Sequence, residues 1–254
     1  MPEMSLRWTA VWRRNWLVWK RLAVPSVLGN LADPLIMLFG LGYGLGAMVG
    51  NVQGSSYFAF LAAGFVATST MYAATFEALY SAFSRMQVQR TWEGIVNAPM
   101  TLDDVLAGEC VWAASKAIAA GGCMLIIVTA FGYAGVLYAI AALPVVLLLG
   151  LAFAALGLTV NALAQGYDFF SYYMTLVLTP MMMLSGVFFP LEQMPAAVQA
   201  GAKSLPLYHG VAIIRPLLAG ELAPALALHI GVLAAYAILG FYAATVLTRR
   251  RLLK

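Results

Sequence analysis

The sequence predicts an all-α polytopic membrane protein, and three observations lead to that fold class. Hydrophobic residues make up 63% of the 254 positions, charged residues make up only 9%, and the apolar residues gather in six long runs. A soluble domain carries about a quarter charged residues and needs that polar surface to stay in water. These observations exclude a soluble globular fold, and with it a soluble enzyme.

Six runs of residues are long and apolar enough to cross a membrane. A spanning helix needs about 20 mostly apolar residues, because the hydrocarbon core of a bilayer is about 30 Å thick. We therefore expect six transmembrane helices. Their expected bounds are residues 27–49, 57–83, 105–131, 137–163, 169–189 and 223–247.

The lysines and arginines indicate the orientation of these helices. Eleven of the 14 lie in the segment before the first span, the loop after the second span and the C-terminal tail, whereas the loop after the fifth span holds only Lys203 and Arg215. Loops rich in lysine and arginine stay in the cytoplasm. Both termini are therefore expected to be cytoplasmic. Because the basic residues flank apolar runs instead of covering a folded face, they do not indicate a nucleic-acid partner.

Residues 1–25 are expected to form an amphipathic helix that lies in the membrane interface. Four tryptophans recur at helical spacing, within about 80° of arc at 100° per residue, and the basic residues lie on the other side. They are Trp8, Trp12, Trp16 and Trp19. We expect the indoles to anchor the helix among membrane lipids. A plain anchor without a role in transport remains the alternative. Residues 26–254 are expected to form one transmembrane domain.

Two connections are too long to be simple turns. Residues 84–104 hold a helix-like stretch, Pro99, and a Thr101-Leu-Asp-Asp104 motif with the form of a capping box. A short helix in this coupling segment would face a cytoplasmic partner. Residues 190–222 hold four prolines among apolar residues. We expect short re-entrant helices on the outer side, between spans five and six, with protein covering their backbone groups.

The sequence lacks the motifs that several kinds of chemistry require. The sequence has no phosphate-binding G-x-x-x-x-G-K-[ST] loop, and Cys110 and Cys123 lie about 20 Å apart along one expected helix. We therefore expect neither ATP hydrolysis nor a metal site nor a disulfide in this chain. The glycine run 40–46 lacks the context of a phosphate loop or an ion filter. Its small-xxx-small spacing favours close helix packing instead.

Ionisable residues inside the expected spans need an explanation, because each costs roughly 2.5 to 3.5 kcal/mol at a helix centre. Structural pairing is the favoured explanation, and contact with a substrate is the alternative. These residues are Asp33, Glu77, Glu109 and Lys116. Aromatic and methionine side chains either line an amphipathic groove together with Glu77 or simply pack the helices. The groove candidates are Phe39, Tyr43, Tyr72, Phe76, Tyr172, Tyr173 and Met182.

Several segments, in order and spacing, resemble the ABC type-2 exporter permeases, and within them the nodulation protein J group of lipooligosaccharide exporters. The similarity spans nearly the whole chain. It is carried by Leu22-Ala-Val-Pro, Ala32-Asp-Pro-Leu, Gly40-Leu-Gly-Tyr-Gly-Leu-Gly, Phe76-Glu-Ala-Leu-Tyr-Ser-Ala-Phe, Gln89-Arg-Thr-Trp-Glu, Leu102-Asp-Asp-Val-Leu-Ala-Gly-Glu, Leu184-Ser-Gly-Val-Phe-Phe-Pro-Leu and Leu205-Pro-Leu-Tyr-His.

The resemblance implies a homodimer in the bacterial inner membrane that works with two copies of a separate ABC ATPase, which would hold ATP and magnesium. It also implies a cytoplasmic coupling helix after the second span. By this similarity, Arg85, Arg90, Trp92 and Glu93 would transmit motion of the ATPases to the spans. The cargo implied is a lipooligosaccharide or another amphipathic glycolipid, with a hydrophobic drug as the alternative.

Two other classes of function remain open. An ion-coupled secondary transporter or channel would act without an ATPase and would use Glu77, Glu109 and Lys116 as a relay, although the two halves of the sequence show no convincing inverted repeat. A structural subunit of a membrane complex would move nothing itself.

Overall fold

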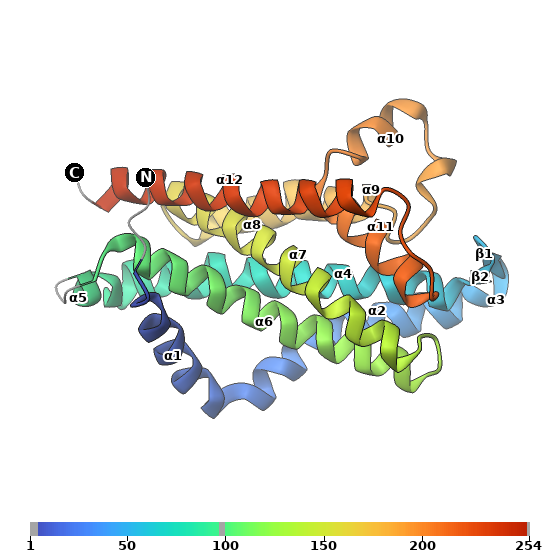
Figure 1. Ribbon diagram of the computed structural model, residues 1–254, viewed down its shortest axis with the longest axis horizontal. Helices are drawn as coiled ribbons and strands as arrows, with labels where there is room; N and C mark the ends of the chain where they lie inside the picture. Colours follow the sequence, from blue (N-terminus) through green and yellow to red (C-terminus); the bar gives the residue numbers. More distant parts are fainter. Residues whose placement is uncertain (1–4, 97–99, 253–254) are drawn as a thin grey trace.

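The computed structural model describes residues 5–96 and 100–252, most of which are helical (Figure 1). Three parts of the predictions lie outside the described residues: the first four residues of the N-terminal segment, residues 97–99 of the coupling segment, and Lys254 of the basic tail.

Within the described residues, five helical runs are long and apolar enough to cross a membrane. The first joins α1 (Trp8–Trp19), the 3-10 turn η1 (Lys20–Leu22), α2 (Ala23–Gly44) and α3 (Gly46–Val49). The second joins α4 (Tyr57–Phe76) to two π-helical segments, η2 (Glu77–Ser81) and η3 (Ser84–Val88). The others are α6 (Leu102–Ala130), α7 (Val136–Leu163) and α12 (Leu226–Leu252). The prediction of an all-α polytopic membrane protein is confirmed at this level.

The expected fifth span, residues 169–189, is not among these five runs. The chain there forms α8 (Tyr167–Tyr173), a π-helical segment η4 (Met174–Leu178) and α9 (Thr179–Leu184). Asp168, Pro180 and several tyrosines and threonines make this stretch less apolar than the other runs. The count of six spans therefore stays a prediction.

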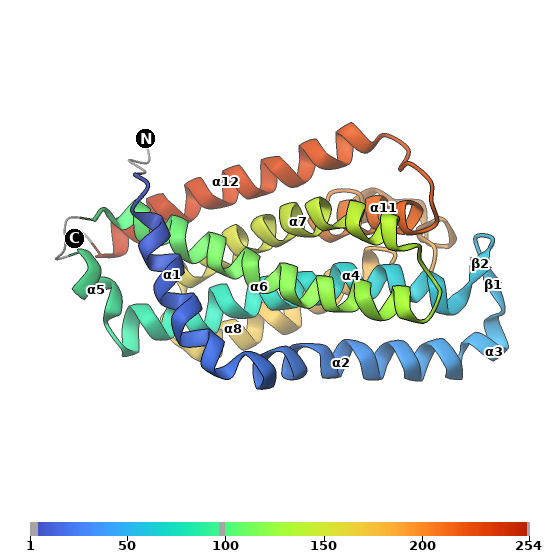
Figure 2. The ribbon, with the colours of Figure 1, turned by 60° about the horizontal axis from the view of Figure 1, so that its bottom comes forward.

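The long helices run side by side and give the molecule two ends (Figures 1 and 2). Helix α4 lies inside the bundle, in contact with α2, α6, α7 and α11 (Pro206–Leu218). The start of α1, the short helix α5 (Thr91–Val96) and the end of α12 lie at one end, which we name the terminus end. The β-hairpin and one end of α11 lie at the other, which we name the hairpin end. Helix α2 runs along the outside of the bundle (Figure 2).

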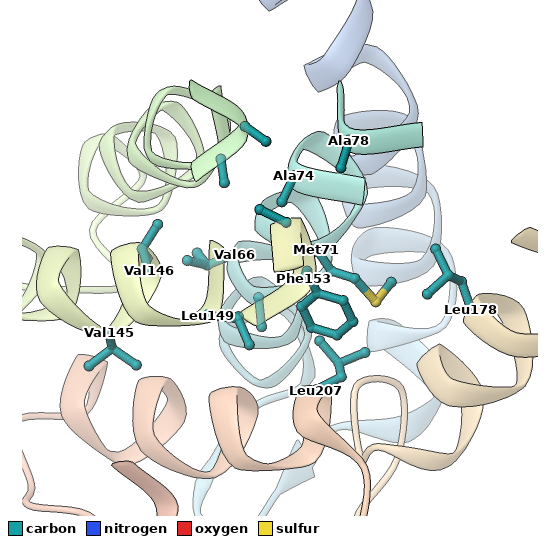
Figure 3. Close-up of a cluster of buried hydrophobic side chains, with 14 of the residues drawn as sticks. Val66, Met71, Ala74, Ala78, Val145, Val146, Leu149, Phe153, Leu178 and Leu207 are labelled. Carbon is teal, nitrogen blue, oxygen red and sulfur yellow. The ribbon is translucent and has the colours of Figure 1, made fainter. Parts of the chain in front are cut away.

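Side chains from α4, α7, α11 and η4 meet in the buried core shown in Figure 3, which includes Met71, Phe153, Leu178 and Leu207. Because lipid tails are as apolar as these side chains, helix association in a membrane depends on close packing, and small residues allow it. A Cβ atom added to Gly150 of α7 would lie 2.8 Å from the Cβ atom of Ala117 in α6. Within the expected packing run 40–46, Gly42 alone meets another helix closely, because an added Cβ would lie 2.5 Å from Phe58.

The two long connections contain short helices. The capping box before α6 is confirmed, because Thr101 accepts from the Asp104 backbone N–H and the Asp104 carboxylate accepts from that of Thr101. The segment before α12 holds a 3-10 turn η5 (Leu191–Gln193), α10 (Ala196–Ala202) and α11. Its re-entrant position in a membrane stays a prediction.

A small hairpin between α3 and α4 was not expected. Strands β1 (Asn51–Val52) and β2 (Ser55–Ser56) pair antiparallel, with Val52 opposite Ser55. Gln53 and Gly54 form the turn with φ angles of 51° and 79°. Two successive positive φ angles are typical of the tight turn whose twist matches a two-stranded hairpin.

The packing of α6 gives a first prediction. In Gly121→Ala the new Cβ would lie 2.7 Å from a methyl group of Val146 and closer still to the Thr70 hydroxyl. Both neighbours are β-branched and stiff, so we expect a loss of about 1–3 kcal/mol in stability. Gly122→Ala is the matched control, because its nearest neighbour would be 3.9 Å away. Melting in detergent, followed by tryptophan fluorescence, tests both variants. Equal melting temperatures would contradict this account of the α6–α7 contact.

Candidate functional site

A buried carboxylate at the terminus end accepts hydrogen bonds from three other parts of the chain. The Glu109 side chain, on α6, is 0% exposed. It accepts bonds from Arg85 Nε (2.9 Å) and Nη2 (2.6 Å), from the Trp92 indole (3.3 Å) and from the Asn15 amide (3.2 Å). Arg14 Nη2 lies 3.6 Å away. Glu109 thus joins α1, η3, α5 and α6.

Arg85 shares its guanidinium between two carboxylates. Its Nη2 group also donates to Glu77 Oε1 at 2.8 Å, so one side chain links η2, η3 and α6. The Arg85 side chain is only 13% exposed. A planar guanidinium suits this arrangement, because its donors point in fixed directions and can grip a carboxylate with two parallel bonds.

Lys116 reaches Glu77 and not Glu109. The Lys116 ammonium lies 3.7 Å from Glu77 Oε2 and donates to the Ser26 hydroxyl at 2.7 Å. The Trp112 indole donates to Glu77 Oε1 at 2.8 Å. The network therefore holds three cations and two carboxylates, and its formal charge is +1. We call this set the ion-pair network: Arg14, Arg85, Lys116, Glu77 and Glu109 with Asn15, Trp92 and Trp112.

A pocket of about 300 Å³ lies beside the network. Residues of α2, of α4 and of α6 line it, and they include Phe76, Glu77 and Lys116. An aromatic ring, a carboxylate and an ammonium thus meet in one small space.

Helix α1 packs against α6 with the face that carries most of its tryptophans. The Trp12 indole donates to the Ser115 hydroxyl at 3.0 Å, and the rings of Trp12 and Trp19 meet Trp112 edge to face. A Cβ atom added to Gly108 would lie 2.6 Å from Val11. The expected anchor tryptophans thus contact protein to a large extent, and Trp16 is the most exposed of the four at 42%.

The four expected coupling residues fall into two groups. Arg85 and Trp92 are buried in the network, whereas Arg90 and Glu93 are exposed at the start of α5. Arg90 adopts a positive φ of 49° where the chain turns from η3 into α5. Trp92 therefore ties an exposed helix to buried charges.

The expected groove residues are spread along the α2–α4 side and do not form one cluster. Phe39 and Tyr43 stack near the hairpin end, with Phe58 beside both rings. Tyr72 of α4 is partly buried against the core. Tyr172 is 65% exposed, while Tyr173 and Met182 are partly buried against the core.

Arg14, Asn15 and Trp112 belong to the network but were not singled out from the sequence. Trp112 had a detectable signal, because residues 109, 112 and 116 share one helix face with spacings of three and four. Arg14 and Asn15 had none, since their contacts depend on how α1 crosses α6. Three further contacts were missed: Arg249 with Asp103, His209 with His229, and Arg215 with Phe60.

The network gives a second prediction. Arg85→Gln leaves Glu77 and Glu109 buried without their main counter-charge, so we expect a loss of about 3–5 kcal/mol in stability. Arg90→Gln, an exposed site five residues along, should melt like the wild type. Adding Glu77→Gln and Glu109→Gln to Arg85→Gln should recover part of the loss. Arg85→Gln melting at the wild-type temperature would show that the network does not stabilise the fold.

The contact between His209 of α11 and His229 of α12 gives a prediction on pH. Their Nδ1 atoms lie 2.7 Å apart, and His209 Nε2 lies 2.9 Å from the carbonyl oxygen of Lys203. Burial, and then the nearby His229, lower the pKa of His209 below its usual 6.5. Protonation therefore opposes folding, so stability is complete above pH 6.5 and falls as the pH decreases. His209→Gln should lose less stability between pH 7 and pH 5 than the wild type. An identical loss would contradict this.

Comparison with known proteins agrees with the geometry. Residues 7–218 match the family model described as ABC-2 type transporter. The chain is 53% identical to nodulation protein J of Rhizobium leguminosarum bv. viciae and of Bradyrhizobium diazoefficiens, over all of this chain and 98% and 97% of theirs. It is 27% identical to the inner membrane transport permease YadH of Escherichia coli, over 84% of this chain and 80% of that protein. The chain belongs to the ABC-2 type transporter family.

Proposed function

We propose that this chain is the membrane subunit of an ATP-driven exporter that moves a lipooligosaccharide or another amphipathic glycolipid out of the cytoplasm. Two copies form a homodimer in the bacterial inner membrane, with both termini in the cytoplasm. Two copies of a separate ATPase subunit bind ATP and magnesium and dock on the cytoplasmic side. The chain itself carries out no hydrolysis.

One observation carries the coupling part of this proposal. Helix α5 exposes Arg90 and Glu93 at the terminus end, while Trp92 between them is 2% exposed and donates to Glu109. A partner that moves α5 therefore moves Trp92 against a carboxylate held by α1, η3 and α6. A partner shifts a conformational equilibrium only through contacts that differ between the two states. The α5 surface offers such a contact.

The relatives and the pocket support the class of cargo. Nodulation protein J matches this chain over its full length. The pocket lined by Phe76, Glu77 and Lys116 combines an aromatic ring with charged groups, as an amphipathic ligand requires. Phe39, Tyr43 and Tyr72 continue along the same α2–α4 side toward the hairpin end. A hydrophobic drug as cargo is the second candidate, favoured by the same aromatic residues.

The ion-coupled alternative is less well supported. A proton relay needs groups that can exchange protons during transport, whereas Glu77 and Glu109 are both bound by Arg85 at 2.9 Å or less. Both carboxylates are therefore committed to ion pairs with the same arginine. These ion pairs favour a structural role for the network over a relay.

The coupling role is tested with Arg90→Glu and Glu93→Lys. Both variants should insert and melt like the wild type, because these side chains are exposed. Each variant should bind the ATPase subunit encoded nearby more weakly, and should reduce ATP-driven glycolipid transport in proteoliposomes. A loss of about 1.4 kcal/mol of binding free energy would lower the affinity for the ATPase subunit about tenfold. Arg13→Glu on α1, an exposed charge outside α5, is the control. Normal coupled transport in both α5 variants would rule out this role.

The cargo is tested separately, by ATP hydrolysis of the reconstituted complex with lipooligosaccharide, with phospholipid alone, or with a hydrophobic dye. Stimulation by lipooligosaccharide alone supports glycolipid export. Stimulation by the dye alone supports the drug-exporter alternative. Ion flux by the permease without any ATPase would overturn the ATP-driven mechanism.

A further inference from the structure

A second pocket, of about 500 Å³, lies at the hairpin end, far from the ion-pair network. Its walls come from the β1–β2 hairpin, the start of α4, the connection between α6 and α7, and the end of α11. These elements lie together at that end in Figure 1. The polar residues among its walls are Gln53, Ser55, Tyr133, Arg215 and Glu221.

Arg215 is the unusual residue in this pocket. Its guanidinium lies 3.6 Å from the centre of the Phe60 ring, and Nη2 donates to the carbonyl oxygens of Gly186 (2.7 Å) and Phe60 (3.4 Å). Among the described residues no carboxylate lies within ion-pair distance of it. Its Nε is enclosed without a hydrogen-bond partner, and no described protein group accepts from Nη1.

A largely buried guanidinium without a carboxylate is costly, because buried charges in proteins are normally paired. Burial lowers the pKa of Arg215 to about 10, so the group still carries its charge at neutral pH. The ion pairs of Arg85 show how the same residue type is satisfied at the other end of this molecule. Arg215 has the ring of Phe60 and two carbonyl oxygens instead, and the carboxylate of Glu192 acts on its charge only from beyond ion-pair distance.

The two nearest candidates for a counter-charge are committed elsewhere or too distant. Glu192 is exposed and accepts a bond from Gln53 Nε2 at 3.1 Å. Glu221 is among the pocket-lining residues, but it is exposed and forms no ion pair with Arg215. The inner part of the pocket is therefore positive, and a carboxylate lies at its more exposed side. This arrangement suits an anion that carries a polar or positively charged substituent.

We propose that this pocket binds the phosphate of a phospholipid headgroup, with Arg215 as its principal ligand. Guanidinium donors match the geometry of phosphate oxygens, and the Ser55 hydroxyl lines the same space. The apolar side chains of Val128 and Leu218, also in the lining, would contact the glycerol end of the lipid. A soluble phosphate offers the same chemistry without this apolar contact. The proposal concerns the permease alone and does not rest on its cargo or on the ATPase.

The test measures lipid retention by the purified, delipidated permease with native mass spectrometry. Phosphatidylglycerol is compared with diacylglycerol of the same chains, which lacks the phosphate. We expect the wild type to retain phosphatidylglycerol at least about tenfold better, as charge-assisted hydrogen bonds would provide. Arg215→Gln should lose this preference. Lys203→Gln removes an exposed cation outside the pocket and should keep it.

A pocket-filling variant keeps the test valid if Arg215→Gln fails to fold. Ser55→Phe places a ring in the pocket from the hairpin, without touching the protein contacts of Arg215, and should also abolish the preference. Glycerol 1-phosphate distinguishes the two sources of phosphate. A contrary outcome is that glycerol 1-phosphate raises the melting temperature of the wild type as much as phosphatidylglycerol does, without raising the melting temperature of Ser55→Phe. That result would show that the site binds soluble phosphate, and it would overturn the assignment to lipid. The proposed site would be contradicted if the wild type retained phosphatidylglycerol and diacylglycerol equally. It would also be contradicted if Ser55→Phe kept the wild-type preference for phosphatidylglycerol.

Discussion

The sharing of one arginine between two buried carboxylates is the constraint on which the terminus end of this protein depends. Arg85 holds Glu77 on the continuation of α4 and Glu109 on α6, and neither carboxylate would be tolerable there alone. Because Arg14, Asn15 and Trp92 bind the same Glu109, α1 and α5 are fixed by the same interaction. These polar contacts add to the apolar packing between α1, η3, α5 and α6, to which Val11, Met86 and Trp92 contribute. A force on α5 then acts on charges and not only on side-chain packing.

Beyond the network, the bundle is held by close packing of small residues, with few polar links. Gly108, Gly121, Gly150 and Gly157 each face a neighbouring helix at a distance that leaves no room for a Cβ atom. At the terminus end, Arg249 of α12 binds Asp103 at the start of α6. Other polar links between helices include the bond from the Thr159 hydroxyl of α7 to the Gly240 carbonyl of α12 and the contact of His209 with His229.

The sequence predicted those features that depend on local pattern. Apolar runs located five long helices to within a few residues at most ends, and Thr101 with Asp104 located the start of α6, because a capping box involves residues only three apart. The stretch 169–189 is not among the five runs, because Pro180 and its tyrosines and threonines make it less apolar, and its role as a span stays a prediction. The network was only partly predictable. Its charges could be named as intramembrane or coupling residues, but the hydrogen bonds to its carboxylates join positions from 8 to 94 residues apart, and no spacing rule encodes how α1 crosses α6.

Each end of the molecule holds a largely buried arginine, but the two arginines have different kinds of partners. This difference bears on how a transporter of this family can work. Arg85 pairs with two of the chain's own carboxylates, so its charge holds helices together. Arg215 is held by an aromatic ring and carbonyl oxygens, which fix its position but form no ion pair with it. Under the proposed function and the proposed lipid site, energy enters at one end and lipid binds at the other, and this division keeps the two separate. A ligand anion at the network would compete with Glu77 and Glu109 for Arg85 and loosen the coupling, whereas an anion at Arg215 breaks no ion pair among the described residues. Under these proposals, a ligand at the hairpin end leaves intact the bond from Trp92 to Glu109, which ties α5 to α6.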